Sequence, residues 1–188
     1  MADIKAIETV YKGYRFRSRL EARWAVFFDA LGIEWAYEPE GYDLGAAGWY
    51  LPDFWLPQLG IHVEIKGAPA TNEELDKCSA FRAGVGAIAL FEGVPDQSAG
   101  YVWAYDMTDS AGGECNCNDA LWRIVNGRVC IMVGGTSRDR DFYNGAGMST
   151  PVPGLAQWQS PQFENMHLWR QLGEAIAAAR SARFEHGQ

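Results

Sequence analysis

The chain has 188 residues, of which 48% are hydrophobic and 13% aromatic, and this composition excludes an intrinsically disordered protein. Its 24 acidic and 16 basic residues give a net charge of −8. This charge argues against nucleic acid as a partner unless basic residues are concentrated locally, because phosphate contacts supply much of the affinity. No apolar run reaches membrane-spanning length and the first residues are polar, so we expect neither membrane contact nor a signal peptide. Four cysteines without a secretory signal favour a reducing compartment.

Basic residues are concentrated near the N-terminus. Residues 12–23 hold five of them and a single acid, Glu21. A local basic cluster lets a protein of acidic overall charge bind nucleic acid, although the same residues could simply keep a helix start solvated. The candidate nucleic-acid contacts in this cluster are Arg15, Arg17, Arg19 and Arg23.

The first predicted helix begins after Ser18 and runs to about Leu31, where Gly32 ends it. Ser18 suits the N-cap, and Glu21 three residues later completes a capping box. Capping alone would account for Glu21. A role in a functional site requires its carboxylate to turn away from the cap. An apolar stripe with helical spacing is expected to face the core, and it consists of Leu20, Trp24, Phe27, Phe28 and Leu31.

A first strand is predicted at Ile33–Tyr37, where apolar and polar residues alternate. Glu38 follows it, and we interpret this residue as a solvated acid at the strand end; the alternative is a further acidic group near a metal site. The segment Tyr42–Gly48 predicts a loop.

Two further strands, Tyr50–Leu56 and Ile61–Lys66, predict a hairpin because turn residues separate them. If the hairpin is symmetric about the bond between Gln58 and Leu59, Asp53 lies opposite Glu64. Their Cβ atoms would then be roughly 5 Å apart. Two carboxylates at this separation repel each other by about 3 kcal/mol at an effective dielectric of about 20.

Such a pair is most readily kept when a cation lies between the carboxylates. The candidates are a hard divalent metal ion, which prefers oxygen ligands, and the ammonium of Lys66 on the same strand face. With a metal, the pair suits phosphodiester cleavage, because the metal polarises the phosphate and acidifies a bound water. The alternative is an ordinary half-exposed hairpin whose charged residues are solvated.

A second helix is predicted to begin at the N-cap Thr71 and to end near Ala83, with Glu74 completing another capping box. The continuous apolar run Val85–Phe91 predicts a strand buried on both faces. The order is therefore helix, three-stranded meander, helix and strand, which places the chain in the α/β (α+β) class.

The hairpin motif resembles that of the PD-(D/E)XK nuclease superfamily. Pro52-Asp53 is followed, after ten residues, by Glu64-Ile65-Lys66, and Ser18–Glu21 resembles the start of the acidic first helix of this superfamily. The similarity to the superfamily covers roughly Tyr14–Glu92, and within it the segment Tyr14–Gly67 resembles small phage-encoded proteins of this type. It implies a restriction-endonuclease-like core.

The resemblance also implies an activity: Mg²⁺-dependent DNA cleavage, with Mn²⁺ as a substitute, leaving 5′-phosphate and 3′-hydroxyl ends. Asp53, Glu64 and the backbone carbonyl of Ile65 would bind the metal. Glu21 would hold a second metal ion or a water, and Lys66 would orient or activate the attacking water. The resemblance further implies a phage or mobile-element origin and a cytoplasmic protein, which acts in the cytoplasm of a bacterial host if it is phage-encoded.

Residues 1–95 are expected to form the nuclease-like core. Residues 96–188 are expected to form an extension of unknown role that packs on this core, so that the two parts make one domain. The extension contains a strand near residues 101–105, a hairpin at residues 121–133 around Asn126-Gly127, a linker at residues 144–160 and a helix at residues 161–184. The apolar side of this helix either closes over the core or forms a homodimer contact.

Two other functions fit the same residues. One is a non-catalytic module that binds nucleic acid or protein on the same fold. The other is a zinc-stabilised interaction protein built on Cys115, Cys117 and Cys130 with His167 or His186. Structural zinc usually takes four ligands in two close pairs. The chain offers only one close pair, so zinc is the less favoured interpretation.

Overall fold

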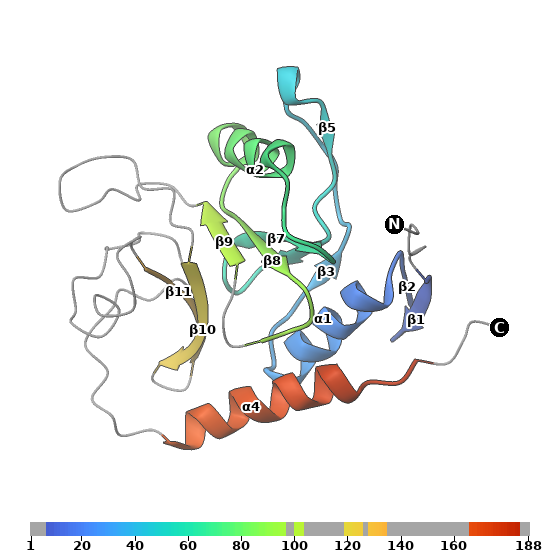
Figure 1. Cartoon of the computed structure of the whole chain (residues 1–188), viewed down its shortest axis with the longest axis vertical. Coiled ribbons are helices and arrows are strands. Elements are labelled where there is room, and N and C mark those ends of the chain that lie inside the picture. The colour runs from blue at the N-terminus through green and yellow to red at the C-terminus, as the bar shows by residue number, and fades with distance from the viewer. Residues whose placement is uncertain (1–6, 97–99, 104–118, 126–127, 135–165, 185–188) are drawn as a thin grey trace.

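Helices and strands are combined in this computed structural model around one mixed sheet (Figure 1). The residues described are 7–96, 100–103, 119–125, 128–134 and 166–184. The five strands of the main sheet, in spatial order, are β3 (Ala36–Tyr37), β6 (Phe54–Leu56), β7 (Ile61–Lys66), β8 (Ile88–Glu92) and β9 (Gly100–Trp103). The helices are α1 (Arg19–Ala30), α2 (Asn72–Gly84) and α4 (Met166–Ser181).

The sheet combines antiparallel and parallel pairs. Strands β3, β6 and β7 form an antiparallel meander, and β8 lies parallel to β7 after the α2 crossover. Strand β9 then adds an antiparallel edge. The mixed α and β class is therefore confirmed. From α1 to β8, the helices and the strands of the main sheet follow the predicted order of helix, three strands, helix and strand, but β4, η1 and β5 are inserted between β3 and β6.

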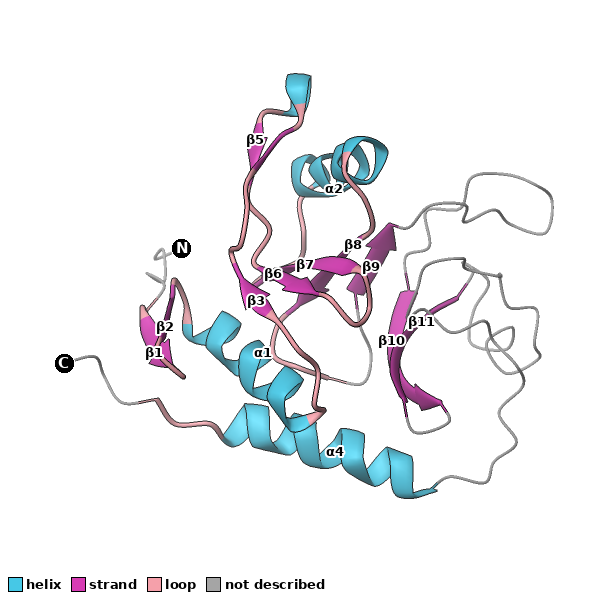
Figure 2. Ribbon diagram, turned by 180° about the vertical axis from the view of Figure 1, so that it is seen from behind, coloured by secondary structure: helices cyan, strands magenta, loops and turns pink. Residues whose placement is uncertain are grey.

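Helices lie on both sides of the sheet (Figure 2), and apolar side chains pack on each of its faces. On one side, α1 and α4 pack against β6 and β7, and on the other α2 packs against β8. Strand β8 serves both layers, because Ala89 and Phe91 join the first and Ile88 and Leu90 join the second. A strand buried on both faces was predicted at this place and is confirmed, with bounds shifted to Ile88–Glu92.

Helix α1 begins and ends as predicted. The side chain of Ser18 caps its N-terminus, and Gly32 takes φ of +68° directly after Leu31, a conformation that costs glycine little. Trp24 is fully inside the core, stacks on Phe91 with ring centroids 4.9 Å apart, and donates a 2.9 Å hydrogen bond to the carbonyl of Gly93. These contacts fix α1 against the end of β8.

Helix α4 closes over the core. Its residues Leu172, Ala175 and Ala179 are buried in the cluster that α1 forms with the sheet, so this part of its apolar face is covered within the chain. The predicted end at residue 184 is wrong, since the helix stops at Ser181. Beyond that point, Phe184 packs edge-on against Tyr11, a contact made from non-helical chain. Residues 161–165 of the predicted helix and the predicted linker lie outside the described residues.

The segment before the central hairpin differs from the prediction. Residues 42–48, expected to form a loop, instead belong to an arm that consists of β4 (Tyr42–Asp43), the short 3₁₀ helix η1 (Gly45–Ala47) and β5 (Trp49–Tyr50). The arm projects beside α2 (Figure 1).

The expected strands around this arm are also shorter. The expected strand over residues 50–56 is broken at residues 51–53, where Pro52 has no N–H for a ladder hydrogen bond. The expected strand at residues 33–37 is reduced to β3, which pairs only with Trp55 and Phe54.

Besides the arm of β4 and β5, two hairpins of the described residues lie outside the main sheet. At the N-terminus, β1 (Thr9–Tyr11) pairs with β2 (Tyr14–Phe16). The predicted hairpin near residues 121–133 is confirmed as β10 (Asp119–Val125) and β11 (Arg128–Gly134).

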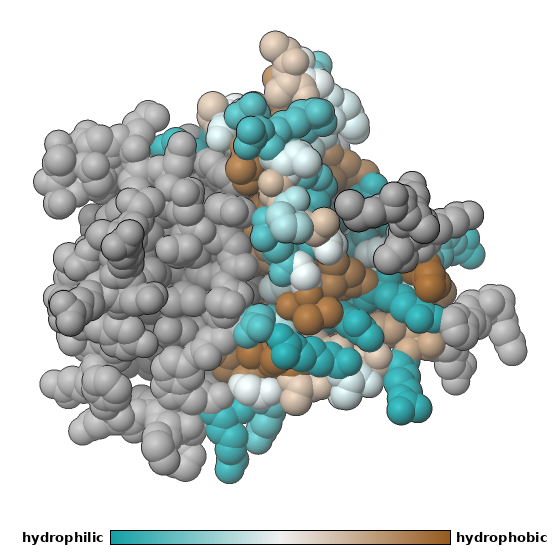
Figure 3. All heavy atoms as spheres, in the orientation of Figure 1, coloured by the Kyte–Doolittle hydropathy of each residue, from teal (hydrophilic) through white to brown (hydrophobic). Residues whose placement is uncertain are grey.

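The outer side of α2 is hydrophilic (Figure 3). None of the helices described in this structure is long and apolar enough to cross a membrane.

Candidate active site

The register of the central hairpin is the predicted one. Phe54 pairs with Val63, Trp55 with His62 and Leu56 with Ile61. Extended by one residue, this register places Asp53 opposite Glu64. The turn keeps the register because the N–H groups of residues 59 and 60 both donate to the carbonyl of Leu56, at 3.1 and 2.9 Å.

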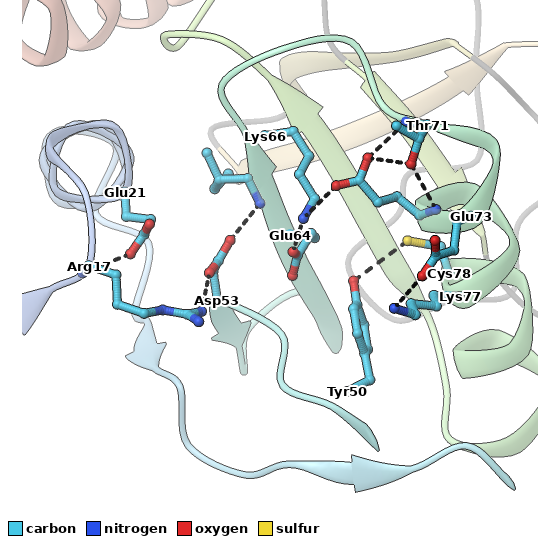
Figure 4. Close-up of polar contacts among 12 residues, drawn as sticks. Arg17, Glu21, Tyr50, Asp53, Glu64, Lys66, Thr71, Glu73, Lys77 and Cys78 are labelled. Atoms are coloured by element: carbon cyan, nitrogen blue, oxygen red, sulfur yellow. Dashed lines mark hydrogen bonds and ion pairs between the residues drawn. The ribbon is translucent and has the colours of Figure 1, made fainter. Parts of the chain in front are cut away.

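Three buried carboxylates gather at this end of the hairpin (Figure 4). Asp53 precedes β6, Glu64 lies in β7 and Glu21 projects from the first turn of α1. Their exposed fractions are 3%, 6% and 8%. Because a buried charge is costly unless it is paired and hydrogen-bonded, the partners of each carboxylate determine what the site can do.

Asp53 is bound through both oxygens. Its Oδ2 accepts a 2.7 Å hydrogen bond from the backbone N–H of Ile65, and its Oδ1 accepts one of 3.1 Å from the guanidinium of Arg17. Burial, followed by the charges of Glu64 and Glu21, raises the pKa of Asp53 well above its usual value, against the opposing effects of Ile65 and Arg17. The hydrogen bond from Ile65 and the charge of Arg17 therefore do not fully offset the burial of Asp53 and the repulsion from its acidic neighbours.

Lys66 bridges two carboxylates from different elements. Its Nζ lies 2.8 Å from Oε1 of Glu64 and 3.0 Å from Oε1 of Glu74 on α2. Burial lowers the pKa of Lys66, but these two carboxylates outweigh burial and raise it, so the side chain is an ammonium at neutral pH. The second oxygen of Glu64, Oε2, is buried and has no hydrogen-bond partner in the described part of the chain.

Glu21 is held by its own loop and by β3. The hydroxyl of Ser18 donates to Oε1 at 2.6 Å, and Oε2 accepts from the hydroxyl of Tyr37 at 2.5 Å and from the backbone N–H of Arg17 at 3.2 Å. The predicted reciprocal capping box is replaced by this arrangement. Ser18 still caps the N–H of Glu21 at 3.2 Å, and the carboxylate is turned towards Tyr37.

Arg17 connects the carboxylates from the solvent side. Its guanidinium binds Asp53 and also forms an ion pair with Glu38. The interpretation of Glu38 as a solvated acid is therefore wrong, since its side chain is 22% exposed and paired. Its backbone N–H donates a 2.9 Å hydrogen bond to the carbonyl of Asp53, which holds the strand end against the site. Burial is the first cause that raises the pKa of Glu38, partly offset by Arg17.

The other predicted arginines lie elsewhere on the same segment. Arg15 is 77% exposed on β2, 3.8 Å from Glu8. Arg19 and Arg23 are partly buried on α1. Of the four candidate nucleic-acid contacts, Arg17 is the one that the structure places at the carboxylates.

Two residues of the site were not identified from the sequence. Glu74 was assigned to a capping box, which it does complete by accepting the N–H of Thr71 at 2.8 Å, but its other oxygen binds Lys66. Tyr37 was treated only as a strand residue. The signal available for both was the need of a buried charge for a partner, and that need does not indicate which distant residue will supply one.

The donors at the site suit a hard metal ion only in part. No group of three His, Cys, Asp or Glu side chains able to hold a metal occurs among the described residues. Mg²⁺, however, is usually bound through one or two carboxylates and completes its shell with water and phosphate oxygens. Asp53 and Glu64, with the unpartnered Oε2 of Glu64, meet that requirement, and the Ile65 carbonyl stays a predicted ligand.

The zinc hypothesis falls on another part of the chain. Cys115, Cys117 and His186 lie outside the described residues, and so do the side chains of Cys130 and His167. The zinc interpretation thus stays a prediction.

Comparison with known proteins gave no match to a family model, to a curated protein or to a solved structure. The function must therefore be argued from the geometry of this site.

Proposed function

We propose that the chain is a Mg²⁺-dependent DNA endonuclease. The observation that carries the proposal is the gathering of Glu21, Asp53 and Glu64, all buried, beside Lys66, with one carboxylate oxygen unpartnered. Such clusters of titratable groups cost folding free energy and are concentrated at functional sites. A hard divalent cation would supply the charge that this cluster lacks.

Each side chain has a role in this proposal. Asp53 and Glu64, with the carbonyl of Ile65, would hold the metal ion, which polarises the phosphate and lowers the pKa of a bound water. Glu21 would hold a second ion or orient a water. Lys66 would place its ammonium near the scissile phosphate, where it offsets the negative charge that develops during attack.

Positioning in this site comes from hydrogen bonds. The N–H of Ile65 fixes one oxygen of Asp53, and Tyr37 and Ser18 fix both oxygens of Glu21. Glu74 holds the ammonium of Lys66 from the side of α2. A site on rigid elements with locked side chains can align a phosphate and a water, which accounts for much of the rate in phosphodiester hydrolysis.

The fold supports the same proposal. Helix, three-stranded meander, helix and strand is the order that resemblance to the PD-(D/E)XK superfamily implies for a restriction-endonuclease-like core. By the same resemblance we propose DNA as substrate, contacted by the N-terminal arginines, products with 5′-phosphate and 3′-hydroxyl ends, and a phage-encoded protein acting in a bacterial cytoplasm. Mn²⁺ is expected to replace Mg²⁺.

A second candidate function is a non-catalytic module that binds nucleic acid or protein. It is favoured by the internal cations, because Arg17 and Lys66 already pair with Asp53 and Glu64. In that case binding would be insensitive to Mg²⁺ and to the loss of Lys66.

Calorimetric titration with Mg²⁺ or Mn²⁺, together with cleavage of a DNA panel, separates the two functions. The panel contains duplex, nicked, branched and single-stranded DNA. We expect the wild-type protein to bind the metal and to cut DNA, and we expect Glu64→Gln to lose both metal binding and DNA cleavage. The matched control is Glu73→Gln, which neutralises an exposed acid on α2 and should behave as wild type.

Two further variants test the assignment of the site. Asp53→Ala and Lys66→Ala should abolish cleavage while leaving the circular dichroism spectrum unchanged. If either variant cut DNA at the wild-type rate, the residue replaced in it would not be catalytic, and this assignment of the site would be wrong. A folded wild type that binds DNA but no metal would establish the binding module instead.

A further inference from the structure

Arg17 occupies the place of a cation at the candidate site. It lies between β2 and α1, fixed on one side by the buried ring of Phe16 and on the other by the N-cap Ser18. From there its guanidinium reaches Oδ1 of Asp53 and the carboxylate of Glu38. Figure 4 shows it lying along the row of carboxylates, next to Asp53.

The two internal cations of the site differ in how firmly they are held. The side chain of Lys66 is 27% exposed and sits 2.8 and 3.0 Å from its two carboxylates. The side chain of Arg17 is 59% exposed, and its contact with Asp53 is 3.1 Å. Because water competes for an exposed guanidinium and screens its charge, Arg17 is the cation that can leave at low cost.

Glu38 gives the guanidinium a second partner that does not depend on Asp53. It has φ of +43°, a left-handed conformation that is unfavourable for residues other than glycine. The hydrogen bond from its N–H to the carbonyl of Asp53 holds it in that conformation. Arg17 can therefore release Asp53 and remain paired with Glu38.

We infer that Arg17 is a displaceable counter-ion, which neutralises Asp53 in the metal-free protein and gives up Oδ1 of Asp53 when a divalent cation binds. This inference rests on the proposed metal site. The metal and the guanidinium compete for one carboxylate oxygen, so Arg17 weakens metal binding while it stabilises the empty site. Metal binding then frees the guanidinium on the solvent side, where a phosphate of the substrate would approach.

The test is calorimetric titration of Mn²⁺ into wild type, Arg17→Gln and Arg15→Gln. Arg15→Gln is the matched control, because it removes the same charge two residues away from an exposed side chain paired only loosely with Glu8. Competition predicts that the Kd for Mn²⁺ falls about fivefold in Arg17→Gln, the effect of losing one partly exposed ion pair. Arg15→Gln should stay within about twofold of wild type, because salt screens exposed charges.

Thermal unfolding in a chelator gives a second measurement that needs no activity. Without metal, Arg17→Gln should melt below wild type and below Arg15→Gln, because Asp53 has lost its counter-ion. Saturating Mn²⁺ should reduce that gap. If Arg17→Gln does not fold, Arg17→Lys replaces it, because it keeps the positive charge but has a shorter side chain. Its Kd for Mn²⁺ should lie below that of wild type by less than the fivefold decrease expected when the charge is removed.

The possible outcomes separate the inference from the function on which it rests. An unchanged or higher Kd in Arg17→Gln, with wild type binding Mn²⁺, would overturn the competition and leave the nuclease proposal standing. Equal decreases of the Kd in Arg17→Gln and Arg15→Gln would show that any lost positive charge strengthens Mn²⁺ binding, and this result would also overturn the competition between Arg17 and the metal. A folded wild type that binds no Mn²⁺ would refute both.

Discussion

Replacement of Tyr37 by phenylalanine tests the hydrogen bonds that hold Glu21. The hydroxyl donates to Oε2 of Glu21 at 2.5 Å and accepts from the N–H of Arg17 at 3.1 Å. A hydrogen bond to a charged group contributes about 1.5–3 kcal/mol, so Tyr37→Phe should lower the free energy of unfolding by about 2 kcal/mol. For a chain of this size that corresponds to a melting temperature lower by roughly 4–8 °C. Urea unfolding followed by circular dichroism measures the loss.

Tyr14→Phe is the matched control for this experiment. Both tyrosine rings pack on Phe16 and both variants keep the ring, but Tyr14 is 43% exposed. A substitution at such a site should change the free energy of unfolding by less than about 0.5 kcal/mol. If Tyr37→Phe unfolds with the same free energy as Tyr14→Phe, the hydroxyl does not stabilise the buried Glu21 and this account of the site is wrong.

Three more predictions follow from the packing and the charges. Burial lowers the pKa of His62 from 6.5 to about 4. Between pH 6.5 and 4 the unfolded chain therefore takes up a proton at this residue and the folded chain does not. As the pH falls through this range, the free energy of unfolding should decrease by at most about 3 kcal/mol. Urea unfolding at pH 7 and 4.5 should show a shallower loss for His62→Gln. Mg²⁺ at ten times its Kd should raise the free energy of unfolding by about 1.4 kcal/mol and the melting temperature by about 3–6 °C, and a thermal scan of Glu64→Gln should show no rise. Leu172→Ala on α4 should lose about 3 kcal/mol in urea unfolding, whereas the exposed Glu174→Ala should lose less than about 0.5 kcal/mol.

Local signals in the sequence predicted much of the framework. The N-caps Ser18 and Thr71 placed the starts of α1 and α2 correctly. Period-two alternation and a symmetric turn predicted the register that puts Asp53 opposite Glu64. These signals work because each depends on residues within a few positions of one another along the chain.

Features set by distant contacts were not predictable in the same way. The arm of β4 and β5 has strands of two residues each, too short for any periodicity to appear. Arg17 meets Asp53 across 36 positions of sequence, and Glu38 turns to it through a backbone conformation that its residue type disfavours. The sequence indicated the carboxylates but not the cations that the fold provides for them.

The packing of α4 on α1 has a consequence for biosynthesis. A ribosome makes the chain from the N-terminus, so the whole segment through β8 is complete long before α4 exists. During that interval the side of α1 that Leu172, Ala175 and Ala179 later cover has no partner, and exposed apolar surface on a nascent domain favours aggregation. We expect the helix that carries Glu21 to reach its final position only when α4 docks. The proposed catalytic site would then be completed only after α4 has been synthesised.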